Sequence, residues 1–321
     1  MKKKPILCIL CLLLALTPAQ AADGYIKWVD FDVSASAMSR ALALDIESRD
    51  SEQPVSWIDI LALAATWTGS GKFSNTTVNK AARALTADQS LEQQLGKQYR
   101  YYLYYREAYG AVLGGLAGSY AIEVTGDDGQ RCWKPAYGLK AFSPIAAGYY
   151  YNHYKDFGAS RGYGFQRKHL GNDLMGALGT PIVAVEGGTV EALGWNRYGG
   201  WRVGIRSDDK KRYWYYAHLR KDNPYAPGLR EGDHVQAGDV IGFMGRSGYS
   251  VKENVDNIKQ VHLHFGLQLI FDESQKECDS EIWVDVYDIV CLLNQHRSSV
   301  QYDPETRTWK RVYPFRDLDA E

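Results

Sequence analysis

The amino-acid sequence predicts an α+β fold in which a helical N-terminal region is followed by an antiparallel, β-rich domain. Two observations predict it. Before about residue 126 apolar side chains recur at the spacing of one helix face, whereas after Cys132 they alternate with polar ones in short runs separated by turns. The chain has 321 residues and is 45% apolar, so it is long enough for two globular domains.

Residues 1–21 have the pattern of a secretory signal peptide. Three lysines are followed by an apolar run over residues 6–16 and by the small-residue sequence Ala19-Gln20-Ala21. The apolar run is about half the length of a membrane span. An uncleaved anchor is the alternative, and only in that case do we expect the protein to be held at a membrane.

The charge balance does not suggest nucleic acid as a partner. The chain has 37 Lys and Arg against 38 Asp and Glu, and loss of the three signal lysines leaves 34 minus 38, or about −4. Cys132, Cys278 and Cys291 then remain, which is too few for a disulfide scaffold. Cys278 and Cys291 are able to pair, but Cys291 falls in a helix predicted over 283–293, which favours a buried free thiol.

Residues 22–125 are predicted to form a helical N-terminal domain. Ser56 precedes apolar residues spaced for one helix face, and Ser90 with Gln93 forms a capping box that opens a long helix through Leu113. We expect the tyrosines of this second helix to pack between helices with their hydroxyl groups reaching water, rather than to form a sugar-binding platform. These tyrosines are Tyr99, Tyr101, Tyr102, Tyr104, Tyr105 and Tyr109.

Residues 126–296 are predicted to form the β-rich domain, beginning at the turn Gly126-Asp127-Asp128-Gly129. Turns such as Glu186-Gly187-Gly188 join its strands, which favours antiparallel pairing. Residues 297–321 are predicted to be a C-terminal tail or, over 300–313, a hairpin. The predicted strands of the domain are 182–185, 189–193, 201–206, 212–219 and 261–269.

The last of these strands carries two histidines. Apolar residues fall on alternate positions, at Leu263, Phe265, Leu267 and Leu269, and a period of two indicates a strand. His262, His264 and Gln268 then share the opposite face, with the imidazoles about 7 Å apart along the strand. Both rings are therefore close enough to act at one centre.

Residues 213–219 alternate in the same way and predict a second strand. The alternation places Trp214, Tyr216 and His218 on one face. We therefore expect His218 to line the same cleft as the paired histidines.

A glycine-rich segment supplies the remaining candidate ligands. His169 and Asp173 lie among four glycines and are followed by Pro181, which predicts a loop rather than a helix. Zinc in catalytic sites takes three protein ligands of His and carboxylate type together with a water molecule. His169, Asp173 and one of the paired histidines supply that set.

Several motifs occur in a fixed order along the chain. They are His169-x-Gly-x-Asp173, Gly179-Thr180-Pro181, Tyr216-Ala217-His218-Leu219, a glycine-rich run from Gly232-Asp233 to Ser247-Gly248, and His262-x-His264. Together, over residues 145–270, they resemble the lysostaphin-like zinc endopeptidases, which cleave peptidoglycan peptides. The resemblance implies that His169, Asp173 and His264 bind one Zn²⁺ per chain and that His218 and His262 are unligated catalytic histidines.

The same resemblance implies that residues 126–296 are a zinc peptidase domain with peptidoglycan peptides as substrate. It further implies hydrolysis by a metal-activated water and a secreted or cell-envelope location in a bacterium. The bond that is cleaved stays open between a glycine-glycine cross-bridge and a D-amino acid linkage.

One segment departs from the family pattern. Residues 249–260 separate the glycine-rich run from His262 by more than the short link that the family leads us to expect. We predict that this insertion borders the groove and affects substrate specificity more than chemistry. Arg161 and Arg167 are expected either to orient substrate or Asp173, or to be solvated. Candidates to flank the groove are Tyr149, Tyr150, Tyr151 and Tyr154.

Three alternatives compete with this activity. A closed structural zinc site needs a fourth protein ligand, and no cysteine lies in a motif with the histidines. A non-enzymatic scaffold that binds the cell wall or a partner and regulates another hydrolase is expected to lose ligands, whereas all five positions are filled. A zinc amidase or carboxypeptidase would use similar chemistry, although the glycine-rich motifs favour the endopeptidase.

Overall fold

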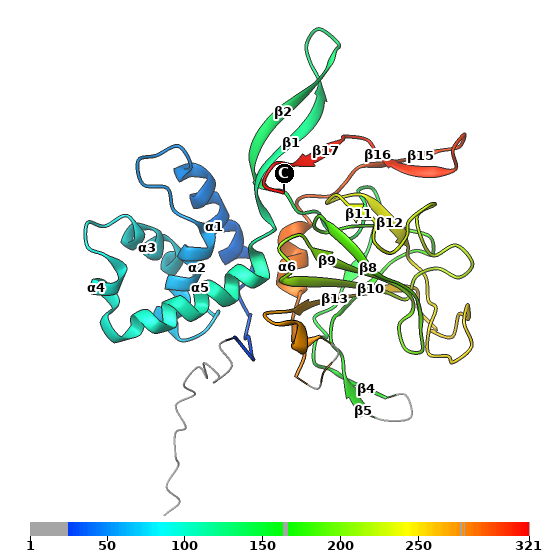
Figure 1. Cartoon of the computed structure of the whole chain (residues 1–321), viewed down its shortest axis with the longest axis horizontal. Helices are drawn as coiled ribbons and strands as arrows, with labels where there is room; N and C mark the ends of the chain where they lie inside the picture. Colours follow the sequence, from blue (N-terminus) through cyan, green and yellow to red (C-terminus); the bar gives the residue numbers. More distant parts are fainter. Residues whose placement is uncertain (1–24, 163–165, 277, 279, 321) are drawn as a thin grey trace, which may run out of the picture.

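The computed structural model describes residues 25–162, 166–276, 278 and 280–320, so the predicted signal peptide lies outside the described residues. Within these ranges no helix is long and apolar enough to cross a membrane. Figure 1 shows a helical part beside a β-rich part, with helix α6 (Tyr287–Leu293) at their junction. This arrangement is the predicted α+β fold.

Serine side chains begin the N-terminal helices. Ser56 accepts a hydrogen bond from the backbone N–H of Ile58, and Ser90 accepts one from that of Gln93. The helix that Ser90 opens is shorter than predicted, because Gly96 follows it at a φ of 52° and a 3₁₀ turn intervenes before the next helix. The helices are α1 (Ala35–Ser48), α2 (Trp57–Thr68), α3 (Asn75–Leu85), α4 (Leu91–Leu95), η1 (Gly96–Gln98) and α5 (Tyr99–Leu113).

The tyrosines of α5 mainly pack within the helical part, as predicted, but the prediction that their hydroxyl groups reach water is wrong for Tyr109, whose hydroxyl is buried. Tyr109 is fully buried and meets the ring of Phe31 edge-on at 5.2 Å. Tyr102 is also buried, and its hydroxyl donates to Asp59 of α2. These rings therefore hold α5 against its neighbours rather than forming a binding platform.

The helical prediction is wrong for the end of the N-terminal region. Residues 117–125 form strand β1 (Ala117–Thr125), which pairs with β2 (Arg131–Leu139) in a hairpin and with β17 (Phe315–Asp317). The helix ends at Gly114-Gly115, after which β-branched residues such as Ile122 and Val124 favour a strand. The predicted turn at 126–129 joins the two strands of this hairpin.

The β-rich part is built on one antiparallel sheet in which the strand order is β11-β8-β9-β10-β13-β6-β3, with β14 also paired to β13. The predicted strands at 189–193, 201–206, 212–219 and 261–269 correspond to β8, β9, β10 and β13, and 182–185 overlaps β7 in a small sheet. The strands are β3 (Asn152–His153), β6 (Asn172–Met175), β7 (Pro181–Val183), β8 (Gly188–Asn196), β9 (Gly200–Ser207), β10 (Arg212–Ala217), β11 (His234–Val235), β12 (Val240–Phe243), β13 (His262–Leu269) and β14 (Ile282–Val284).

Two short hairpins complete the fold. β15 (Val300–Asp303) and β16 (Thr308–Arg311) form the predicted C-terminal hairpin, and β4 (Ser160–Gly162) pairs with β5 (Gln166–Lys168) beside the sheet. The helix predicted over 283–293 is wrong at its start, because 282–284 form β14 against the edge of β13 and the helix is limited to α6. Cys291 in α6 is a free, half-buried thiol, and Cys278 is free as well.

The helical and β-rich parts share one hydrophobic core, which runs from Ile26 in the N-terminal segment to Leu293 in α6. A buried ion pair joins them at the end of α5. Arg212 of β10 binds Glu186 at 2.8 Å and donates to the carbonyl oxygen of Ala111 at 2.8 Å. Buried contacts thus cross the boundary predicted at residue 126. That boundary between two domains stays a prediction.

Candidate metal centre

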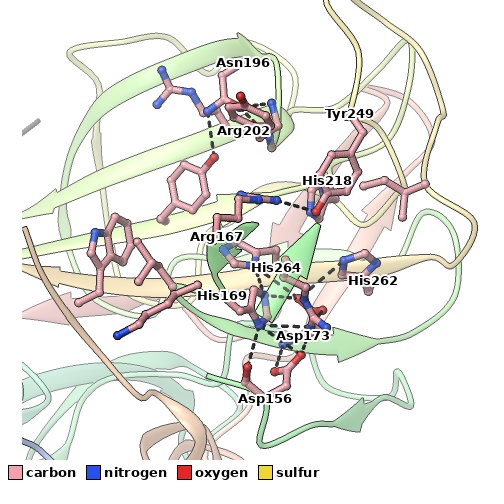
Figure 2. Close-up of a pocket in the computed structure, with 18 of the residues that line it drawn as sticks. Asp156, Arg167, His169, Asp173, Asn196, Arg202, His218, Tyr249, His262 and His264 are labelled. Carbon is pink, nitrogen blue, oxygen red and sulfur yellow. Dashed lines mark hydrogen bonds and ion pairs between the residues drawn. The ribbon is translucent and has the colours of Figure 1, made fainter. Parts of the chain in front are cut away.

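His169, Asp173 and His264 converge where β6 and β13 pair in the sheet. Asp173 of β6 lies directly opposite His264 of β13 in the strand register, and His169 precedes β6 in the connection from β5. His169 Nε2 is 3.0 Å from Asp173 Oδ1 and 2.8 Å from His264 Nδ1, while His264 Nδ1 is 3.4 Å from the same carboxylate oxygen. Figure 2 shows the three side chains pointing at one another.

This arrangement corrects one local prediction. Asp173 lies in a strand rather than in a loop, because residues 172–175 pair with both β13 and β3. Gly171 allows the close approach that this pairing needs. A Cβ on Gly171 would lie 2.6 Å from the carbonyl oxygen of Phe265 and 2.8 Å from the ring of His264. The central glycine of the His-x-Gly-x-Asp motif therefore gives the His264 ring its space.

Burial and mutual contact set the charges of the cluster. Burial would raise the pKa of Asp173, but the close contacts of its carboxylate with the His169 and His264 rings outweigh that effect and hold the pKa well below its usual range. Burial lowers the pKa of His264 to about 4, and the neighbouring His169 acts in the same direction. An ionised carboxylate thus faces a neutral imidazole, and both carry free electron pairs.

His218 and His262 stand beside these three residues. The His262 ring lies 4.8 Å from the His218 ring, and His262 Nε2 is 3.7 Å from Asp173 Oδ1. His218 Nδ1 contacts the carbonyl oxygen of Ser247 at 2.9 Å, and His262 Nδ1 contacts that of Gln260 at 3.0 Å. A carbonyl oxygen only accepts, so both Nδ1 atoms carry a proton, and in the neutral form of each ring Nε2 is the acceptor.

The predicted face of His218 is wrong, although its predicted place in the cleft is right. Trp214 and Tyr216 pack on Phe265 in the core, so continued alternation would send His218 away from the cleft. His218 instead follows the last residue of β10 at a φ of 62°, a left-handed conformation that is uncommon for residues other than glycine. This local reversal turns the imidazole toward His262.

Asp156 is a functional candidate that the sequence reading missed. Its Oδ2 lies 3.3 Å from His169 Nδ1, its carbonyl oxygen lies 3.1 Å from the same nitrogen, and its Oδ1 accepts from the backbone N–H of Asp173 at 3.2 Å. Burial raises the pKa of Asp156, and the charge of Asp173 adds to this effect. Asp156 therefore fixes the His169 ring so that Nε2 faces the cluster.

The cluster forms the floor of a cleft of about 1010 Å³. Tyr249, Ile258, Lys259 and Gln260 line it, so the 249–260 insertion borders the groove as predicted. Of the four candidate flanking tyrosines, Tyr154 lines the cleft, whereas Tyr149 and Tyr151 pack against the core. Further lining residues that the sequence did not indicate are Asn196, Tyr198, Gly199, Arg202 and Trp283.

The chemistry of the three converging residues fits a divalent metal. One potential ligand atom from each of His169, Asp173 and His264 lies within 4.8 Å of the others, and two imidazoles with one carboxylate are a usual ligand set for catalytic zinc. Asp156 against His169 supplies the outer carboxylate that such histidines commonly have. The open cleft leaves room for a further, non-protein ligand.

A β-rich fold with this residue set defines a metallopeptidase domain, and comparison with known families agrees. Residues 167–277 match the sequence profile of peptidase family M23, a family of zinc metallopeptidases. The matched segment contains all five clustered residues.

Individual relatives extend the comparison. The L-Ala–D-Glu endopeptidase of Bacillus subtilis (strain 168) is 41% identical over 124 residues, covering 39% of this chain and 36% of the relative. Lysostaphin of Staphylococcus simulans is 36% identical over 98 residues, covering 30% of this chain and 17% of the relative. The chain thus spans only about a third or less of the length of these relatives.

One solved structure is similar over most of the chain. The lytM crystal structure from Ruminococcus gnavus ATCC 29149 has a TM-score of 0.54 and 25% identity, and the match covers 84% of this chain and 91% of that one. The match is too long for the β-rich part alone. N-terminal helices followed by an antiparallel M23 domain are therefore an arrangement that this chain shares with a solved structure.

Proposed function

We propose that this chain is a zinc-dependent endopeptidase that hydrolyses peptide bonds of bacterial peptidoglycan outside the cytoplasm. One observation carries the proposal: the convergence of His169, Asp173 and His264 beside two further imidazoles on the floor of an open cleft. A regulatory scaffold has no need of this complete set. The named activities of the Bacillus and Staphylococcus relatives, and the predicted signal at 1–21, support the substrate and the location.

His169 Nε2, Asp173 Oδ1 and His264 Nδ1 would hold one zinc ion. Zinc bound there would supply a Lewis acid and bring the pKa of a water molecule toward about 7. The protein's own residues provide the remaining parts. Asp156 and the carbonyl oxygen of Gln260 orient His169 and His262, so neither ring has to reorganise during the reaction.

His218 and His262 handle the protons. Burial holds the pKa of His218 well below its usual value, with the neighbouring His262 contributing, so its Nε2 is an acceptor at neutral pH. One of the two imidazoles accepts a proton as water attacks the amide carbonyl carbon. The other, when its Nε2 holds a proton taken from solvent, donates a hydrogen bond to the developing oxyanion. The accepted proton then passes to the amine nitrogen as the C–N bond breaks.

Digestion of purified cell walls tests this function. The mature chain is incubated with walls of several cross-link types, and the released peptides are identified by mass spectrometry. We expect new amino termini from at least one wall type, and none with a His262→Ala variant. Absence of any new peptide from every wall, in a preparation that holds zinc, would contradict the proposed activity. Release of glycan-free intact stems alone would indicate an amidase instead.

A further inference from the structure

Two arginines face each other across the β4–β5 hairpin beside the metal centre. Arg161 and Arg167 are directly opposed in the strand register, so their side chains leave the same face of the hairpin. Both line the cleft. Like charges placed opposite each other destabilise a strand pair, and an anionic partner offsets that effect.

The protein neutralises only one of this pair. Arg161 binds Asp156 and contacts Asp173 Oδ2 at 3.0 Å. Arg167 has no carboxylate of a described residue within 4.0 Å, and its buried Nε has no hydrogen-bond partner there. One positive charge of the pair is therefore left for a group that enters the cleft.

Arg167 is nevertheless held in place. Its terminal nitrogen donates to the hydroxyl of Tyr249 at 2.6 Å, and its guanidinium lies 5.1 Å from the ring centre of Tyr198 and 5.4 Å from that of Tyr249. The Tyr249 ring is in turn 6.0 Å from the ring of His218. Figure 2 shows Arg167 beside His218 and above the metal cluster. The charge is thus fixed next to the catalytic histidines.

The lining of the cleft as a whole carries more positive than negative side chains. Its Lys and Arg residues outnumber its Asp and Glu residues by six to three, and two of the three acids are Asp156 and Asp173 of the metal centre. The whole chain, by contrast, has a formal charge of −1. The positive character is therefore concentrated where substrate binds. The six cations are Arg161, Arg167, Lys168, Arg202, Lys259 and Lys276.

We propose that Arg167 binds a carboxylate of the substrate next to the scissile bond, so that the enzyme selects acidic peptides over neutral glycine bridges. This inference rests on the proposed peptidase function and names its substrate class. A guanidinium held by two tyrosines presents a planar fork that a carboxylate matches and an amide does not. Tyr249 belongs to the 249–260 insertion, which gives that segment a part in specificity.

Paired synthetic peptides test the proposal. The first contains an L-Ala–D-Glu bond with a free carboxylate beside it, the second differs only by amidation of that carboxylate, and the third is pentaglycine. We expect the zinc-loaded wild type to prefer the first over the second by about tenfold or more in kcat/KM, mostly through KM. Arg167→Gln should reduce that preference to within about threefold, and Arg167→Lys should retain part of it.

Arg197 provides a matched control. Its guanidinium also lies over the Tyr198 ring, at 5.5 Å, but it is not among the residues that line the cleft. Arg197→Gln should keep the full preference. Equal losses on the acidic and amidated peptides in Arg167→Gln, with zinc content unchanged, would show a structural role and overturn the proposal. A wild type that prefers the amidated peptide or pentaglycine would overturn it as well.

Binding separates this inference from the proposed function. Fluorescence anisotropy measures the affinity of the labelled acidic and amidated peptides for the zinc-loaded wild type and for Arg167→Gln. Arg167-dependent preference for the acidic peptide without any hydrolysis would contradict the peptidase function and keep the inference. Hydrolysis without a preference for the acidic peptide would contradict the inference about Arg167 and keep the peptidase function.

Discussion

Two buried polar clusters lie on opposite faces of the same sheet, and they differ in how their polar atoms are paired. The closed cluster consists of Glu186, Arg212 and Trp214 at the helical side. Arg212 Nε and Trp214 Nε1 both donate to Glu186 Oε2 at 2.8 Å, and the remaining Arg212 nitrogens bind Glu186, Asp209 and the end of α5. The open cluster, His169, Asp173 and His264, brings electron-pair donors together at the foot of a cleft.

The difference distinguishes a structural polar group from a functional one. In the closed cluster each charge meets an opposite charge or a carbonyl oxygen, and the result is a satisfied contact between two parts of the fold. In the open cluster three acceptors lie together, an arrangement that costs free energy unless a cation binds. Both clusters are buried, so burial alone does not distinguish them. What distinguishes them is whether each hydrogen-bond acceptor is matched by a donor.

The largest expected effect is on catalysis by the two histidines beside the open cluster. His218→Ala and His262→Ala should each lower the hydrolysis rate by about 10² to 10⁴, because each removes a proton acceptor or an oxyanion donor. Both variants should keep zinc, since neither ring is in the ligand set. Rates on purified cell wall and metal analysis of the same samples check this, and loss of zinc in either variant would argue against the assignment.

Substitutions in the closed cluster should change the stability of the fold and leave metal binding unchanged. Arg212→Met leaves Glu186 buried without its charge partner, which we expect to lower the free energy of unfolding by about 3–5 kcal/mol. Arg212→Met combined with Glu186→Gln should recover part of the loss. Urea denaturation measures both, with zinc per folded chain as the control. Unchanged stability together with loss of zinc would reverse the roles given to the two clusters.

The outer carboxylate of the open cluster should have the smallest effect. Asp156→Ala removes a hydrogen-bond partner of His169 but no ligand, so zinc affinity should fall by about 10- to 100-fold. Competition with a chelator measures the affinity. Asp239→Ala, which removes a surface partner of Arg311, is the matched control and should leave zinc affinity unchanged. Equal zinc affinity in Asp156→Ala and wild type would show that Asp156 pairs with Arg161 without contributing to the metal site.

The sequence predicted those parts of the site that depend on local periodicity. Alternation over 262–269 placed His262 and His264 on one strand face, and the structure has them there. His218 needed a backbone reversal at positive φ, which alternation cannot indicate. Asp156 contacts His169 only through the tertiary fold, across an irregular segment, so no spacing reveals it. The strand at 117–125 was not predicted, because an apolar run that directly follows a long helix has the same composition as a further turn of that helix.

Zinc content of three proteins tests the central claim most directly. Wild type, His264→Ala and His262→Ala are purified, supplied with zinc, desalted and measured by mass spectrometry of the metal, with circular dichroism to confirm folding. The open cluster predicts one zinc per chain in wild type and in His262→Ala, and almost none in folded His264→Ala. Zinc retained by His264→Ala and lost from His262→Ala would contradict the assignment, and a folded, zinc-supplied wild type without zinc would contradict the metal centre itself.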